Sequence, residues 1–149
     1  MTLNSIVSDA INPALALLPA GMDTQAARVM LLAIGLQESR FTHRRQIGGP
    51  ARGFWQFEKG SRESRGGVWG VYLHSASKDR LAALCKARSV SCDPDAIYAA
   101  LEYDDVLAAG VARLLLWTDP KALPPVGDAP ASWALYLRTW RPGKPHPHT

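Results

Sequence analysis

The chain has 149 residues, enough for one domain with a buried core and too few for two. With 47% hydrophobic and 20% charged residues, its composition excludes wholesale disorder. The net charge of +4 suits an anionic polymer, either bacterial cell wall or nucleic acid, and is equally compatible with a merely soluble surface.

The N-terminal region, residues 3–18, is predicted to form a short helix pair that Pro13 interrupts. No basic region precedes its apolar stretch, and Asp9 and Asn12 also break that stretch, so no secretory signal is predicted. No apolar run in the sequence approaches the ~20 residues of a membrane span. We therefore expect a protein made in a cytoplasm.

The next helix is predicted to begin at a cap on Asp23 or Thr24 and to end at Glu38. Its apolar face consists of Ala27, Leu31 and Ile34. Glu38 falls on that face by the 3.6-residue period, and Gly35 indicates a close neighbour. Partial burial and the negative end of the helix dipole both raise the pKa of a carboxyl group placed there. A carboxyl that stays protonated near neutral pH is what a general acid requires.

A turn at residues 48–50 and an alternating strand at residues 54–58 are predicted to follow. One face of this strand would carry Phe54, Gln56 and Glu58, and the other Trp55 and Phe57. Gln56 beside Glu38 would form one wall of a cleft for a ligand rich in hydroxyl or amide groups. The fold class predicted is therefore mainly α with a small β-hairpin, with the cleft between the helical lobe and the hairpin.

Further helices are predicted at residues 78–88, at 93–117 with a bend near Asp104, and at 132–140. A loop rich in Gly, Ser and Arg, residues 59–70, and a proline-rich connection, residues 119–131, separate them. The single domain is predicted to span residues 1–141, followed by an extended tail of Pro and His over residues 142–149.

Two cysteines, Cys85 and Cys92, either pair in an oxidising compartment or remain free thiols. With only these two cysteines, and with His146 and His148 in the tail, no metal-ligand cluster is predicted.

The pair Glu38-Ser39, followed by Gly53-Phe54-Trp55-Gln56, resembles the lytic transglycosylases of the lysozyme-like superfamily, in particular small phage-encoded members. In that family Glu-Ser ends a helix and Gly-Leu-Met-Gln lies on a short hairpin. The resemblance covers about a fifth of the chain and rests on two short motifs in the right order.

The resemblance implies cleavage of peptidoglycan glycan strands without a cofactor. Glu38 would protonate the glycosidic oxygen between N-acetylmuramic acid and N-acetylglucosamine, and then accept the proton of the C6 hydroxyl as a 1,6-anhydro sugar forms. Ser39 would hold the catalytic group or the substrate, and Gln56 would contact the adjacent sugar.

The family's third motif, Ala-Tyr-Asn-Ala-Gly, is absent here, and residues 137–143 occupy its usual place. Trp140 then stands where the tyrosine would be, or Tyr136, one turn earlier, supplies the phenol. Arg141 is a further candidate for substrate binding.

Glu58 offers an alternative chemistry, because it is predicted to share a strand face with Gln56. Two carboxylates about 6.5 to 9.5 Å apart favour an inverting hydrolase. The protein would then be a muramidase resembling goose-type lysozyme. An exposed glutamate at a strand end is the simpler interpretation.

Three further alternatives stay open. A catalytically silent virion or cell-wall-binding protein would keep the aromatic cleft, although the presence of Glu38 argues against it. Burial of Glu38 against a basic partner in a structural ion pair is a separate alternative. A nucleic-acid partner is not expected, because Arg44, Arg45, Arg62 and Arg65 lie in predicted loops without a helix-turn-helix pattern.

A protein without a secretory signal needs help to reach the cell wall. The candidate partners are a holin that opens the membrane at lysis and a phage virion that carries the protein to the wall.

Overall fold

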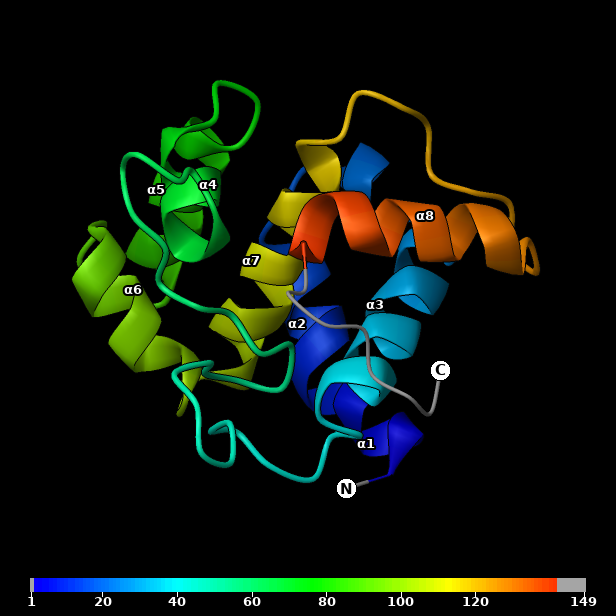
Figure 1. The fold of residues 1–149 in the computed structure, drawn as a ribbon, viewed down its shortest axis with the longest axis horizontal. Coiled ribbons are helices and arrows are strands. Elements are labelled where there is room, and N and C mark those ends of the chain that lie inside the picture. Colours follow the sequence, from blue (N-terminus) through cyan, green and yellow to red (C-terminus); the bar gives the residue numbers. More distant parts are fainter. Residues whose placement is uncertain (1, 142–149) are drawn as a thin grey trace.

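The computed structural model describes residues 2–141, so the predicted tail, residues 142–149 with His146 and His148, lies outside the described residues. The chain is mainly helical, as predicted. No helix within residues 2–141 is long and apolar enough to cross a membrane. The helical elements (Figure 1) are α1 (Leu3–Ile6), a π-helical turn (Val7–Ile11), α2 (Asn12–Ala16), a 3-10 turn (Ala20–Met22), α3 (Gln25–Glu38), α4 (Gly67–Leu73), α5 (Lys78–Ala87), α6 (Pro94–Leu101), α7 (Asp105–Trp117) and α8 (Ala129–Trp140).

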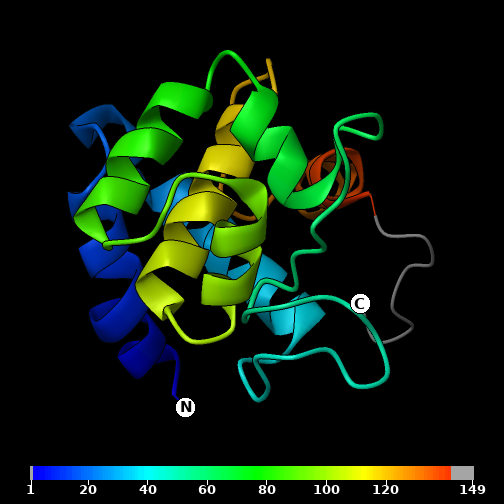
Figure 2. The same ribbon diagram turned by 90° about the vertical axis from the view of Figure 1, so that its left-hand side faces the viewer.

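Helix α7 occupies the centre of the molecule, and Figure 2 shows it surrounded by the other helices. Every residue of α7 from 106 to 116 is buried, and all of them except Arg113 are apolar, as expected for a helix surrounded by other elements. The predicted bend near Asp104 is a complete break between α6 and α7. The Asp104 side chain accepts a hydrogen bond from the backbone N–H of Leu107 at 2.9 Å, and this cap starts the new helix.

Pro13 does not interrupt the N-terminal segment, which corrects the predicted helix pair. The backbone stays in right-handed helical conformation at Val7 and at Asn12, where one helical type passes into the next. The π-helical turn directly precedes α2, and Pro13 stands in the first turn of α2. Because proline lacks an N–H and clashes with the carbonyl one turn back, a widened turn at this point lets the helix continue.

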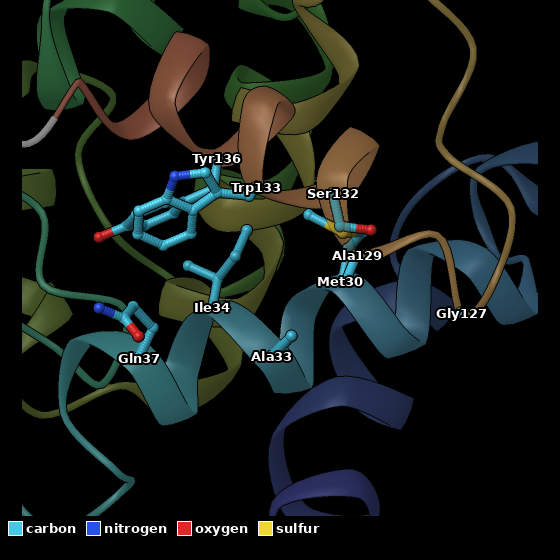
Figure 3. A pocket seen from close by; sticks show the side chains of 9 residues that line it. All are labelled: Met30, Ala33, Ile34, Gln37, Gly127, Ala129, Ser132, Trp133 and Tyr136. Atoms are coloured by element: carbon cyan, nitrogen blue, oxygen red, sulfur yellow. The ribbon is translucent and has the colours of Figure 1, made fainter. Parts of the chain in front are cut away.

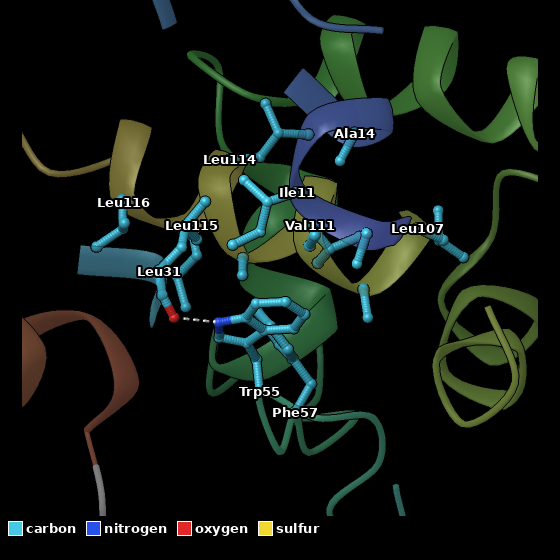
Figure 4. Close-up of a cluster of buried hydrophobic side chains, with 14 of the residues drawn as sticks. Ile11, Ala14, Leu31, Trp55, Phe57, Leu107, Val111, Leu114, Leu115 and Leu116 are labelled. Carbon is cyan, nitrogen blue, oxygen red and sulfur yellow. Dashed lines mark hydrogen bonds between the residues drawn. The ribbon is translucent and has the colours of Figure 1, made fainter. Parts of the chain in front are cut away.

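The aromatic core is built on the end of α3 and the segment that follows. Trp55 is fully buried against α7 and donates from Nε1 to the carbonyl oxygen of Leu31 at 2.8 Å (Figure 4). The Phe41 ring meets the rings of Phe54 and Trp55 edge-on, with 5.5 Å between centroids in each pair. The close neighbour predicted for Gly35 is Phe41, since a Cβ at Gly35 would clash with its ring.

The predicted hairpin is not confirmed. Residues 2–141 contain no regular strand, and only isolated antiparallel bridges join Arg45 to Arg52 and Arg52 to Phe57. Residues 53–56 form a turn closed by reciprocal backbone hydrogen bonds of 2.9 Å between Arg52 and Phe57.

The expected alternation of faces fails because residues 54, 55, 56 and 57 are all buried. A strand exposes one of its faces to solvent unless a second layer covers it. The turn instead directs both Phe54 and Trp55 into the core. It requires a left-handed conformation at Gly53 (φ +77°) and at Gln56 (φ +53°).

Cys85 and Cys92 are both free thiols in this structure, Cys85 buried and Cys92 exposed. Burial raises the pKa of the Cys85 thiol to about 12, and a hydrogen bond with Cys92 adds to this rise. The two thiols therefore lie close together.

Candidate active site

Glu38 is the last residue of α3, the position predicted for it. Of the two predicted caps, Asp23 and Thr24, the helix uses Thr24, whose hydroxyl accepts a hydrogen bond from the N–H of Ala27 at 3.1 Å. It ends because Arg40 and Phe41 adopt left-handed backbone conformations, each with φ of 55°. The Glu38 side chain is half-buried at this helix end.

Tyr136 of α8 contacts the Glu38 carboxyl, and its hydroxyl donates a hydrogen bond to Oε2. Burial raises the pKa of Glu38, and the Tyr136 hydrogen bond partly offsets that rise. Burial and the same hydrogen bond raise the pKa of Tyr136, so the phenol keeps its proton near neutral pH. The arrangement is a half-buried carboxyl group that holds its proton more tightly than usual and is oriented by a phenol.

Of the two residues predicted to supply a phenol or its substitute, Tyr136 is the one beside Glu38. Trp140 lies one turn further along α8 and donates from Nε1 to the carbonyl oxygen of Trp55 at 2.9 Å. Its ring packs on Phe57, with 5.6 Å between centroids, and stacks on Tyr136 at 6.4 Å. Trp140 thus joins α8 to the 53–57 segment.

Ser39 is buried and faces the 53–56 turn. Its hydroxyl donates to the carbonyl oxygen of Phe54 at 2.6 Å and accepts from the N–H of Phe41 at 3.1 Å. These two bonds fix the turn against the end of α3. Ser39 therefore helps to position the residues around Glu38.

Gln56 is buried at the end of the turn rather than on a strand. Its side-chain Nε2 donates to the carbonyl oxygen of Gly53 at 2.9 Å, and its own backbone N–H donates to the same oxygen at the same distance. The amide therefore stabilises the turn from within.

The two remaining predicted residues, Glu58 and Arg141, are exposed. The backbone carbonyl of Glu58 accepts a hydrogen bond from Val68 at 3.0 Å, which anchors the start of α4. Arg141, in left-handed conformation after α8, donates from Nη2 to the carbonyl oxygen of Arg65 at 2.9 Å. Arg141 thus holds the loop between residues 59 and 66 against the end of α8.

A pocket of about 340 Å³ lies between α3 and α8 (Figure 3). Its walls are mainly apolar and aromatic, formed by Met30, Ala33, Ile34, Gln37, Gly127, Ala129, Ser132, Trp133 and Tyr136. Two of its lining residues adjoin the carboxyl group of Glu38: Gln37 precedes Glu38 in the chain, and Tyr136 donates a hydrogen bond to it. The pocket therefore lies next to Glu38.

Sequence reasoning did not identify Gln37 or Trp133 as site residues. Nε2 of Gln37 is buried and has no hydrogen-bond partner within residues 2–141. The Trp133 ring lies 5.1 Å from that of Tyr136 between centroids. The signal was available in part, because Trp133 and Tyr136 are three residues apart and share a helix face.

The basic loop after α3 is engaged in ion pairs. Arg44 binds Asp105 through two hydrogen bonds of 2.9 and 2.8 Å, and Arg45 binds Glu102 at 2.9 Å. These pairs join the loop to the junction between α6 and α7. Their charges are thus partly neutralised within the protein.

No group of three or more His, Cys, Asp or Glu side chains arranged to hold a metal ion occurs among residues 2–141. No family model, curated protein or solved structure matches this chain.

Proposed function

We propose that this protein is a lytic transglycosylase that cleaves the β-1,4 bond between N-acetylmuramic acid and N-acetylglucosamine in peptidoglycan. The observation that carries the proposal is the contact between Glu38 and Tyr136, because it places a half-buried carboxyl of raised pKa under the hydroxyl of a buried phenol. The motif resemblance supports the same reading. We further propose a lysozyme-like arrangement, in which the irregular 45–57 segment takes the place of the hairpin beside the helical lobe.

In the proposed reaction Glu38 starts as a general acid. Its proton passes to the glycosidic oxygen as the bond from that oxygen to C1 of the muramic residue breaks. Burial raises the pKa of Glu38 and so favours retention of the proton that a general acid must donate. The Tyr136 hydroxyl stabilises the carboxylate that results, since hydrogen bonds to ionised acceptors are the stronger ones.

Glu38 then acts as a base. The carboxylate takes the proton of the C6 hydroxyl while the C6 oxygen bonds to C1. This step gives the 1,6-anhydro product and returns Glu38 to its protonated starting state. No water enters the products. One carboxyl group therefore serves both steps.

The other candidate residues fall into two groups under this proposal. Ser39, Gln56 and Trp140 are positioning residues, because their side chains bond to the backbone around the site. The pocket between α3 and α8 would accept part of the glycan, with Trp133 as an apolar surface and the Gln37 amide as a donor.

Mass spectrometry of the soluble products from purified peptidoglycan tests the proposal, with wild type compared with Glu38→Gln and Glu58→Gln. We expect anhydromuropeptides from the wild type and from Glu58→Gln, and none from Glu38→Gln. Reducing-end products that need Glu58 would instead establish the muramidase. A wild type that releases nothing but sediments with peptidoglycan would establish the silent wall-binding protein.

The biological setting is proposed with the activity. The enzyme would act on the bacterial cell wall after a holin has opened the membrane or a virion has carried the enzyme to the wall.

A further inference from the structure

A second cavity, of about 680 Å³, opens beside the start of α3 and the end of α7. Helix α3 has 14 residues, so this cavity is about 20 Å from Glu38 at the far end of the helix. Residues of different chemistry line it, among them Thr24, Arg113, Trp117, Asp119, Lys121 and Leu123. It belongs neither to the Glu38 site nor to the pocket described above.

Arg113 is an unusual wall residue because it is only 2% exposed and comes from the central helix α7. Its Nε donates to the carbonyl oxygen of Met22 at 2.8 Å. Nη1 is buried and finds no hydrogen-bond partner in the part of the chain that the structure describes. Burial lowers the pKa of Arg113 to about 10, so the guanidinium is still charged at neutral pH. Buried charges are normally paired, and the Nη1 group of this guanidinium has no partner among the described residues.

The acidic residues near Arg113 are already bound to other arginines. Asp119, which also lines the cavity, accepts two hydrogen bonds from Arg138, at 3.0 and 3.1 Å. Asp23 accepts two from Arg28, at 2.8 and 3.0 Å. Asp23 also raises the pKa of Arg113, but by less than burial lowers it. The cavity therefore keeps an excess of positive charge.

Two further features favour an anion: the start of α3, where the cap residue Thr24 lines the cavity, and Lys121. The first turn of α3 begins at Thr24, and the N–H groups of Gln25 and Ala26 have no acceptor within the helix. A helix N-terminus attracts anions through such groups and through its dipole. Lys121 adds an exposed ammonium group at the same cavity.

Trp117 provides a surface of different character. Its side chain is 39% exposed, and its ring centroid lies 5.5 Å from the Arg113 guanidinium. The Arg80 guanidinium also lies over this ring, 5.9 Å from its centroid, so the exposed part of the indole is the surface that a flat or apolar group would contact. The cavity volume is also within the range of small-molecule sites.

We propose that this cavity is a binding site for a small ligand that carries a phosphate or carboxylate group on a ring. Arg113, Lys121 and the first turn of α3 hold the oxyanion, and Trp117 holds the ring. The inference is independent of the proposed glycan chemistry, because it uses none of the residues of the Glu38 site.

The test is an NMR titration of the ¹⁵N-labelled protein with inorganic phosphate, phenyl phosphate and benzoate. We expect shifts concentrated at the amides of Gln25 and Ala26 and at the Trp117 indole N–H. Phenyl phosphate should bind more tightly than phosphate because of the ring. Comparing phenyl phosphate with benzoate identifies the preferred anion.

Variants decide whether the charges of this cavity are responsible. Arg113→Met keeps most of the side-chain volume and should weaken phenyl phosphate binding by about tenfold or more. Lys121→Gln, at an exposed position where folding is not at risk, should weaken it by a smaller factor. Lys86→Gln removes the same charge from an exposed position on α5 and should leave binding unchanged.

The proposal fails if none of the three probes shifts the α3 amides, or if Lys121→Gln and Lys86→Gln weaken binding equally. It also fails if a folded Arg113→Met binds as wild type does.

Discussion

Removing the Tyr136 hydroxyl should destabilise the protein by an amount that depends on pH. Tyr136→Phe keeps the ring between Trp133 and Trp140 and deletes the donor to Glu38. A hydrogen bond to a neutral acceptor contributes about 0.5–1.5 kcal/mol, and one to a charged acceptor about 1.5–3 kcal/mol. We therefore expect a loss of about 1 kcal/mol where Glu38 is protonated and about 2 kcal/mol where it is ionised.

The sign follows from the pKa of Glu38. Burial raises it, so the stabilising effect of Glu38 is complete below its unfolded pKa and is lost as the pH rises through the folded pKa. The Tyr136 hydrogen bond limits that loss because it lowers the pKa again. Without it the folded pKa is higher, and the difference between variant and wild type must increase with pH.

Urea unfolding of both proteins at several values between about pH 4 and pH 8 measures the difference. Tyr98→Phe is the matched control, because the Tyr98 hydroxyl donates to the backbone carbonyl of Pro50, an acceptor that does not titrate. Its cost should be independent of pH. A cost of Tyr136→Phe that is equally flat would refute the reasoning that Tyr136 and Glu38 are coupled.

Three further predictions concern stability. Gly35→Ala should lower the free energy of unfolding by about 1–2 kcal/mol, since displacing the buried Phe41 ring outweighs the gain in helix propensity; urea unfolding measures it. Glu38→Gln should raise the stability above the folded pKa of Glu38, and the gain should vanish as the pH falls, because the amide carries no charge to bury; melting curves across pH show this. Mild oxidation should join Cys85 to Cys92 and stabilise the protein by about 2–3 kcal/mol through closure of a short loop; intact mass and melting temperature with and without reductant report it.

Each of these has a control and an opposing outcome. Gly21→Ala adds a Cβ where no atom lies within 4 Å, and equal losses in the two glycine variants would exclude the clash with Phe41. Glu58→Gln makes the same change at an exposed carboxyl and is the matched control, and an equal gain in both glutamine variants would exclude burial of Glu38 as the cause. Cys92→Ser should abolish the response to oxidant, and a dimer formed instead would show that the two thiols do not pair within one chain.

The position of Glu38 could be predicted because helix periodicity, a cap and a stop signal all act within about four turns of chain. Thr24 caps the helix and Gly35 has a close neighbour, as the sequence indicated. These are local effects, and residues nearby in the sequence determine them.

The segment around Trp55 was predicted wrongly because alternation is a valid sign of a strand only when one face meets solvent. Here α3 and α7 cover Trp55, and Ser39 draws in the carbonyl of Phe54. When both faces of a segment are buried, an extended strand no longer separates apolar from polar side chains better than a turn does. The sequence near Trp55 does not reveal that both faces are covered, because the covering helices come from distant parts of the chain.

The choice between Tyr136 and Trp140 was also out of reach of the sequence. The two lie one turn apart on α8, so the rotation of that helix decides which one meets Glu38. The bond from Trp140 to the carbonyl oxygen of Trp55 sets that rotation, and it joins residues 85 positions apart.

The pairing of α3 with α8 also imposes an order in time. Tyr136 follows Glu38 by 98 residues in the chain, so the ribosome adds Glu38 long before it adds Tyr136. During synthesis the central helix and the aromatic core can form first, and α8 docks on them last. A nascent chain of this protein therefore carries an incomplete Glu38 site until α8 has left the ribosome.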